Sequence, residues 1–125
     1  MQKYLPLRLY FVLMMTDLKY LQQMTGNDDV MIKEMIELFL NQLVEVRSDI
    51  KLLVECKNWT ELSRLAHKVK SSALVMGIEQ MAKDMKELEL LAKESKDIEK
   101  YPDYVERLNS AIDLAEVELK TYLSD

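Results

Sequence analysis

Apolar residues recur every three or four positions along most of this chain, the spacing that places them on one face of a helix. The longest such run follows the polar turn Asn27-Asp28-Asp29 and continues for about five turns, until Asn58-Trp59-Thr60 interrupts it. Its apolar positions are Ile32, Met35, Ile36, Phe39, Leu43, Val46, Ile50 and Leu53. No segment shows sustained alternation of apolar and polar residues, and no Asn-Gly or Asp-Gly hairpin turn occurs, so the pattern predicts helices and no strands.

Shorter helices are predicted on both sides of this long one. A first helix can be capped by Thr16 or Asp17, and it runs to about Met24, where Gly26 stops it. The helix that follows the long one ends at Gly77, because glycine commonly occupies the position just after a helix end.

Two further helices are separated by a charged segment. Residues 93–100 are predicted to form a loop, and Pro102 suits the first turn of the last helix. The apolar stripes are Ile78, Met81, Ala82, Met85, Leu88 and Ala92 on the fourth helix and Val105, Leu108, Ile112, Ala115, Leu119 and Tyr122 on the last. We therefore expect an all-α fold: an antiparallel (up-down) four-helix bundle with a short extra N-terminal helix over one end. The Met and Tyr residues on these stripes are expected to be core residues.

The stretch from Leu62 to Ile78 differs from the rest of the chain in its charge. It contains the only histidine, His67, and it has no acidic residue between Glu61 and Glu79. On a helix, its apolar stripe consists of Leu62, Leu65, Val69, Ala73 and Met76. His67 then lies about 170° from the middle of that stripe, so the imidazole is expected to project from the outer face.

Small and basic residues share this face with His67. Arg64 and Lys70 lie three residues before and after it, Ser71 lies one turn further on, and Lys68 adds to the basic island. A neutral imidazole is available at physiological pH and is a competent nucleophile, while phosphoryl transfer mainly needs positioning and positive charge. The pattern thus predicts a phosphoacceptor histidine with Lys70 and Arg64 stabilising the phosphoryl group. The alternative is a solvated helix face that carries one histidine.

These residues resemble the signature of histidine-containing phosphotransfer (Hpt) domains, which runs Ala-His-x-x-Lys-Gly-Ser and is followed by a helix-ending Gly. The match here is Ala66-His67-Lys68-Val69-Lys70-Ser71-Ser72, followed by Met76-Gly77. The likeness extends to Asp17-Leu18-x-x-Leu21, Gly26-Asn27-Asp28, Phe39-Leu40, Asn58-Trp59 and Leu88-Glu89-x-Leu91-Ala92. One departure is Ser71, where the family usually has Gly; because Ser is also small, the site is expected to remain accessible.

Glu89 is the second candidate site residue. It lies about 45° from the centre of the apolar stripe of its helix, where a carboxylate is not expected without a reason. We expect it to face the helix of His67, accept a hydrogen bond from Nδ1–H and leave Nε2 free to react. The Hpt resemblance implies the same role, and the alternative is an ordinary surface carboxylate. Lys93, one turn further on, is expected to add positive charge near the phosphoryl group.

A docking surface for partner proteins is predicted beside His67. Leu74 lies on the same helix face, two turns along, and Leu18, Leu21 and Met24 of the short first helix can extend that apolar surface. The resemblance implies that receiver domains of response regulators dock there.

Composition narrows the remaining choices. A chain of 125 residues is one domain, its net charge of −5 argues against nucleic acid, and the single Cys56 fits a reducing cytoplasm. Residues 1–15 form an apolar extension that is too short to span a membrane and is broken by Pro6 and Arg8. We expect the natural start at Met15, with residues 16–125 forming the bundle; the alternative is an amphipathic extension that packs on it.

No other chemistry is favoured by the sequence. One His and one Cys make no ordinary zinc site, and no Gly-rich ATP-binding loop occurs, so autokinase activity is not expected. The resemblance implies a non-enzymatic phosphorelay intermediate in which His67 takes a phosphoryl group from a receiver aspartate, or from a histidine kinase relay, and passes it to another receiver aspartate. The expected partners are receiver domains and a hybrid histidine kinase, with Mg²⁺ on the receiver, no cofactor on this chain and a monomeric state. The alternatives are a degenerate Hpt-like module that docks receivers without being phosphorylated, and a structural bundle that pairs through its apolar extension.

Overall fold

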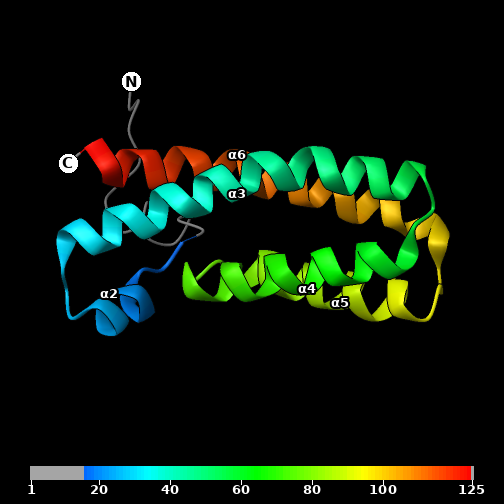
Figure 1. Cartoon of the computed structure of the whole chain (residues 1–125), viewed down its shortest axis with the longest axis horizontal. Helices are drawn as coiled ribbons and strands as arrows, with labels where there is room; N and C mark the ends of the chain where they lie inside the picture. The colour runs from blue at the N-terminus through cyan, green and yellow to red at the C-terminus, as the bar shows by residue number, and fades with distance from the viewer. Residues whose placement is uncertain (1–15, 125) are drawn as a thin grey trace, which may run out of the picture.

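The computed structural model of the chain describes residues 16–124, which consist almost entirely of helices (Figure 1). In chain order these are α2 (Lys19–Thr25), α3 (Asp29–Glu55), α4 (Trp59–Val75), α5 (Glu79–Lys93), the 3₁₀ turn η1 (Ile98–Lys100) and α6 (Tyr101–Ser124). No strand occurs within residues 16–124. The predicted all-α fold is therefore confirmed.

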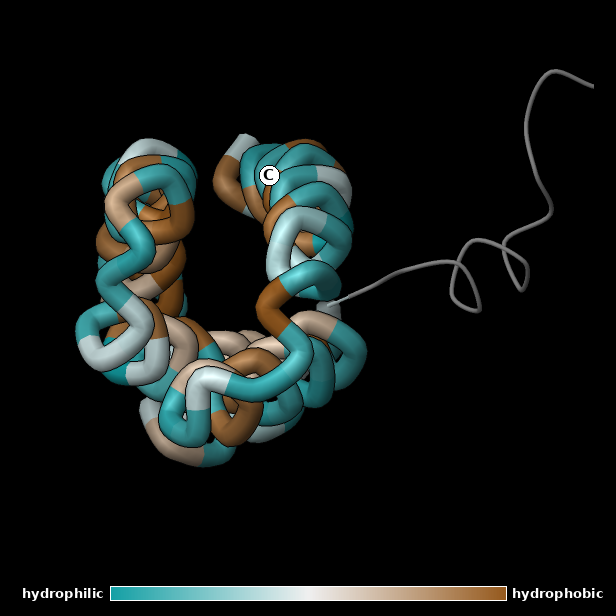
Figure 2. Tube along the Cα trace, turned by 90° about the vertical axis from the view of Figure 1, so that its right-hand side faces the viewer, coloured by the Kyte–Doolittle hydropathy of each residue, from teal (hydrophilic) through white to brown (hydrophobic). Residues whose placement is uncertain are grey.

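The four long helices form an antiparallel bundle in which each packs on the next and α6 packs back on α3. In Figure 1 the chain runs along α3, returns along α4, runs forward again along α5 and returns along α6. Figure 2 shows these helices end-on, arranged around a common axis. The short helix α2 lies at the end of the bundle where α3 begins, as the apolar pattern predicts.

The predicted apolar stripes form the core. Ile36 and Ile50 of α3, Leu88 of α5 and Leu119 of α6 are all fully buried. Burying one such side chain contributes about 1.5 to 3 kcal/mol, so the core favours this arrangement over any that turns a stripe outward. Leu40 of α3 is also buried although it lies beside the predicted stripe, because α6 covers that flank of α3.

The helix ends follow the predicted local signals. Asp28 caps α3 by accepting a hydrogen bond from the Met31 N–H at 3.2 Å, and Asn58 caps α4 by accepting one from the Glu61 N–H at 3.2 Å. Gly77 follows the end of α4 with a φ of +66°, the left-handed conformation that glycine adopts without strain.

Two other helix ends differ in part from their predictions. Helix α2 begins at Lys19, whose N–H donates to Asp17 Oδ1 at 3.0 Å, so Asp17 caps the helix from the position before the formal N-cap, Leu18. The Thr16 N–H donates to Glu118 Oε1 on α6 (3.4 Å) and the Asp17 N–H donates to the Met76 carbonyl (3.2 Å), and these two bonds hold the segment against the bundle. Between α5 and α6, Ile98–Lys100 forms a 3₁₀ turn within the segment predicted as a loop.

The predicted extension, residues 1–15, lies outside the described residues. Both interpretations of this extension therefore stay predictions. The boundary between residues 15 and 16 stays a prediction. Among the helices of residues 16–124, none has the length and apolar character needed to cross a membrane.

Candidate functional site

His67 lies on the outer face of α4, where 58% of its side chain is exposed to solvent. The opposite face of α4 is anchored in the core by Leu62, Ala66, Val69 and Ala73. Since these residues fix the rotation of the helix, the imidazole cannot turn inward without exposing the apolar stripe. The ring is thus held where another protein can reach it.

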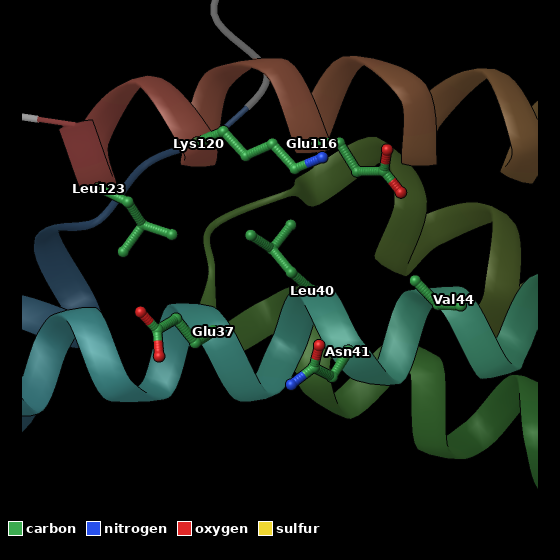
Figure 3. A pocket seen from close by; sticks show the side chains of 7 residues that line it. All are labelled: Glu37, Leu40, Asn41, Val44, Glu116, Lys120 and Leu123. Atoms are coloured by element: carbon green, nitrogen blue, oxygen red, sulfur yellow. The ribbon is translucent and has the colours of Figure 1, made fainter.

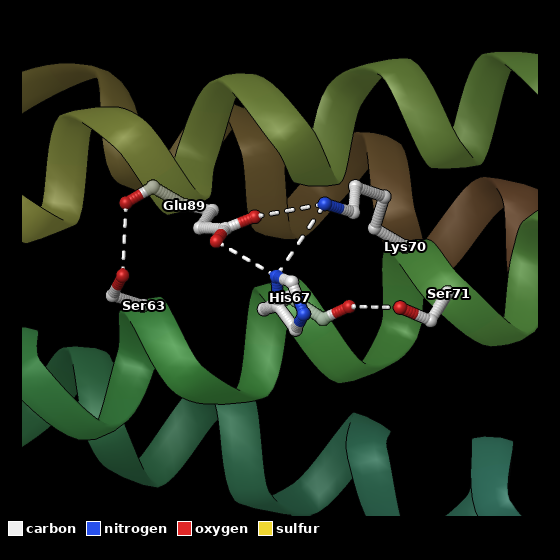
Figure 4. A network of polar contacts seen from close by, with 5 residues as sticks. All are labelled: Ser63, His67, Lys70, Ser71 and Glu89. Carbon is white, nitrogen blue, oxygen red and sulfur yellow. Dashed lines mark hydrogen bonds and ion pairs between the residues drawn. The ribbon is translucent and has the colours of Figure 1, made fainter.

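Glu89 of α5 lies directly beside the ring, with its Oε2 atom 2.8 Å from His67 Nδ1 (Figure 4). A carboxylate at this distance accepts a hydrogen bond, so the neutral ring carries its proton on Nδ1 and leaves the Nε2 lone pair free. Partial burial tends to raise the pKa of the Glu89 carboxyl, but the hydrogen bond from His67 and the charge of Lys70 outweigh it and lower the pKa. Glu89 is therefore ionised at neutral pH.

Lys70 shares this carboxylate with the imidazole. Its Nζ atom lies 3.4 Å from Glu89 Oε1 and 3.4 Å from His67 Nδ1, and its side chain is 22% exposed. Nδ1–H and the ammonium group are both donors, so the contact between them is not a hydrogen bond when the ring carries its proton on Nδ1. The contact does place the positive charge of Lys70 near the ring. The ammonium group therefore lies beside Nδ1, with Glu89 as its partner.

Two serine hydroxyls complete the polar network around His67 (Figure 4). Ser63 Oγ, one turn before His67, donates to the backbone carbonyl of Glu89 at 2.9 Å. Ser71 Oγ donates to the backbone carbonyl of His67 at 3.2 Å, so its hydroxyl bonds within its own helix. The network thus joins α4 and α5 at the level of the imidazole, and it offers one free ring nitrogen beside an ionised carboxylate and a cation.

The sequence model of the Hpt domain matches residues 34–118, a segment that contains α4, α5 and every residue of this network. The chain belongs to the Hpt domain family. Neither the curated proteins nor the solved structures with which the sequence was compared gave a match. Members of this family are phosphocarrier modules of two-component signalling, and they interact with receiver domains and histidine kinases. The family resemblance predicted from the histidine motif is thereby confirmed.

The other predicted cations of this Hpt domain line two hollows near His67. Arg64 and Lys93 line a hollow beside His67 and Glu89, and Arg64 also forms an ion pair with Glu61 of its own helix. Lys68 instead lines the groove between α3 and α4, on the other side of Arg64. Positive charge is thus spread over both flanks of the exposed imidazole.

The apolar surface beside the site differs from the prediction in the short helix. Leu21 is completely buried, and Leu18 is half-buried against the core, so neither forms an exposed contact surface. Because α2 turns Leu21 into the bundle, its exposed apolar residues are Tyr20 and Met24, which are 54% and 48% exposed. Leu74 of α4, 55% exposed, shares a surface hollow with Tyr20.

Ser63 is the residue of the network that the sequence prediction missed. The only available signal was its place one turn before His67 on the same helix face, which many surface serines share. Its bond partner lies 26 residues away, on a neighbouring helix.

Another hollow lies between α3 and α6, on the helix pair that does not carry His67 (Figure 3). It is lined by Glu37, Leu40, Asn41, Val44, Glu116, Lys120 and Leu123. This lining contains no nucleophile such as Cys or His. Within residues 16–124, no group of three or more His, Cys, Asp or Glu side chains is gathered as in a metal site.

Proposed function

We propose that this Hpt domain is a phosphorelay intermediate whose phosphoacceptor is His67. Nε2 attacks the phosphorus of an aspartyl phosphate on a receiver domain; the Nε2–P bond forms, the P–O bond to the aspartate breaks, and the receiver carboxylate leaves. The reverse reaction on another receiver passes the group onward. The observation that carries this proposal is the pairing of His67 Nδ1 with Glu89 Oε2 at 2.8 Å on a ring that is otherwise open to solvent.

Glu89 has a specific part in this step. When Nε2 bonds to phosphorus while Nδ1 keeps its proton, the ring gains positive charge. An ionised carboxylate on Nδ1–H stabilises that charge, and it also holds the ring so that Nε2 faces the incoming group. Glu89 thereby orients the imidazole and lowers the energy of the phosphorylated form.

Lys70 stabilises the phosphoryl group after a small movement. In the resting protein its ammonium group pairs with Glu89 on the Nδ1 side of the ring. A phosphoryl group on Nε2 brings up to two negative charges close by, and the long, flexible lysine side chain can turn toward those oxygens. Arg64, Lys68 and Lys93 add positive charge at the rim, where their effect is weaker and screened by salt.

The partners are proposed from the surface around the imidazole. Receiver domains of response regulators and of a hybrid histidine kinase dock over Leu74, with Tyr20 and Met24 of α2 extending the apolar area. In this proposal the receiver supplies Mg²⁺ and most of the catalytic groups, and this chain needs no cofactor and has no autokinase activity. We further propose that the chain acts in the cytoplasm as a monomer. The acidic net charge of −5 gives nucleic acid no broad basic surface to bind.

The proposal is tested by incubating the protein with a phosphorylated receiver domain and following the label. The expected product is labelled protein whose label is lost in acid and kept in alkali, as for phosphohistidine. A His67→Gln variant, which keeps a polar side chain at this exposed position, should accept no label, and ATP without a receiver should give none either. Label that persists in His67→Gln contradicts the assignment, whereas receiver binding without label supports the degenerate docking module instead.

A further inference from the structure

Ser63 stands out because its hydroxyl bonds across a helix interface. Serine and threonine within helices commonly donate back to a carbonyl of their own helix. Ser48 of α3 and Ser71 of α4 do so, bonding to Glu45 and His67 of their own helices. Ser63 Oγ instead crosses from α4 to the Glu89 carbonyl of α5 at 2.9 Å.

All side-chain hydrogen bonds between α4 and α5 in the described part of the chain converge on Glu89. His67 and Lys70 bind its two carboxylate oxygens, and Ser63 binds its backbone carbonyl. We infer that Ser63 is a positioning residue, which holds the backbone of Glu89 in the register that lets its carboxylate reach His67 Nδ1. The inference rests on the proposed function, because it concerns the same imidazole.

The physical reason lies in the difference between apolar packing and a hydrogen bond. Apolar contacts are non-directional, so they fix the distance between α4 and α5 more tightly than they fix the position of one helix along the axis of the other. A hydrogen bond requires a narrow range of distance and angle. The Ser63 bond therefore fixes this axial position at the level of the site. Reactions that depend on a positioned group lose much of their rate when the group is misplaced by about 1 Å.

The ring nitrogens of His67 report this role directly. His67 is the only histidine of the chain, so ¹⁵N NMR detects a single imidazole. In the wild type the ring is expected to carry its proton on Nδ1. Ser63→Ala should move the Nδ1 and Nε2 shifts toward each other as the other tautomer becomes populated, and Ser63→Thr, which keeps the hydroxyl, should restore the wild-type shifts. Ser48→Ala, which removes a hydroxyl that bonds only within α3, is the matched control and should change neither shift.

The rate of phosphoryl transfer gives the second readout. At saturating phosphorylated receiver, Ser63→Ala should transfer about threefold to tenfold more slowly, the effect of losing one neutral hydrogen bond, with an unchanged half-saturating receiver concentration. In a Glu89→Ala background the same substitution should cost nothing further, because Ser63 acts only through Glu89. Circular dichroism should show an intact fold, since alanine is the best helix former.

Three results would overturn the inference. They are unchanged ring shifts in Ser63→Ala, a slower transfer that Ser63→Thr does not restore, and an equal loss of rate with and without Glu89. Because the NMR readout needs no phosphorylation, it tests Ser63 even if the wild type accepts no label, a result that would contradict the proposed function alone.

Discussion

The carboxylate of Glu89 and the imidazole of His67 meet at 2.8 Å although they come from different helices and are separated by 22 residues in the chain. This contact leaves one ring nitrogen engaged and the other exposed, which is the arrangement that a phosphoacceptor histidine needs.

Replacing Glu89 should slow transfer without preventing receiver binding. Glu89→Ala removes a charge-assisted hydrogen bond, so the transfer rate at saturating receiver is expected to fall about tenfold to a hundredfold. Glu89→Gln keeps an oxygen that accepts from Nδ1–H but loses the charge, and it should fall between the wild type and Glu89→Ala. Rapid-quench measurement of labelled Hpt domain checks both, and equal rates for all three proteins would contradict the role of Glu89.

Lys70→Ala should reduce the transfer rate by about tenfold or more, because a cation near the transferred group is lost. Lys70→Arg, which keeps the charge, is the matched control and should retain most of the activity. The free energy of unfolding should change by less than about 1 kcal/mol, since the partly exposed Lys70–Glu89 ion pair contributes little. Urea unfolding beside the transfer assay separates the two effects; an unchanged rate in Lys70→Ala argues against phosphate binding by this residue.

The stability contributed by Glu89 should depend on pH. Its pKa is lower in the folded protein than the ordinary value of 4.5, so the folded state favours the ionised form. Its contribution to stability is fully present above that ordinary value and is lost as the pH falls through the lower folded-state pKa. Urea unfolding of the wild type and Glu89→Gln should therefore show a difference at neutral pH that shrinks as the pH falls below 4.5. A difference that grows as the pH falls below 4.5 would contradict the direction of the pKa shift.

Gly77→Ala should destabilise the fold by about 2 to 4 kcal/mol. An added Cβ would lie 2.0 Å from the Asp17 carbonyl oxygen, so the segment before α2 would have to move and lose its bond to Met76. Gly26 has a similar φ of +63° with no atom within 4 Å of such a Cβ, so Gly26→Ala should cost only the backbone strain, about 1 to 2 kcal/mol. Urea midpoints compare the two variants, and equal losses would show that the Asp17 contact does not matter.

The two leucines first assigned to one docking surface should now behave differently. Leu21 is completely buried, so Leu21→Ala is expected to cost about 2 to 5 kcal/mol of stability. Leu74 is exposed, so Leu74→Ala should leave the unfolding midpoint nearly unchanged and raise the Kd for a receiver domain severalfold. Calorimetric titration with a receiver domain measures that Kd, and an unchanged value would remove Leu74 from the docking surface.

Local signals in the sequence were sufficient to predict the four long helices and the exposure of His67. The caps at Asp28 and Asn58 act on residues three positions away, and Gly77 ends its helix through its own backbone conformation. The outward direction of His67 follows from one helix and its apolar stripe. Each of these features depends on neighbours within about one or two turns, a range over which a sequence pattern can be read directly.

Only the tertiary structure decided how the helices are set against one another. The pairing of Lys70 with Glu89, the bond from Ser63 to α5, the bond from Thr16 to Glu118 and the burial of Leu21 all depend on the rotation and register of separate elements. Glu89 was predicted because a carboxylate at the edge of an apolar stripe is unusual within its own helix. Ser63 was not, because a hydroxyl has the same appearance in the sequence whether it bonds to its own helix or to the next. The sequence determined which face each of the four long helices buries, and packing between the helices determined how α2 is turned and which polar atoms meet.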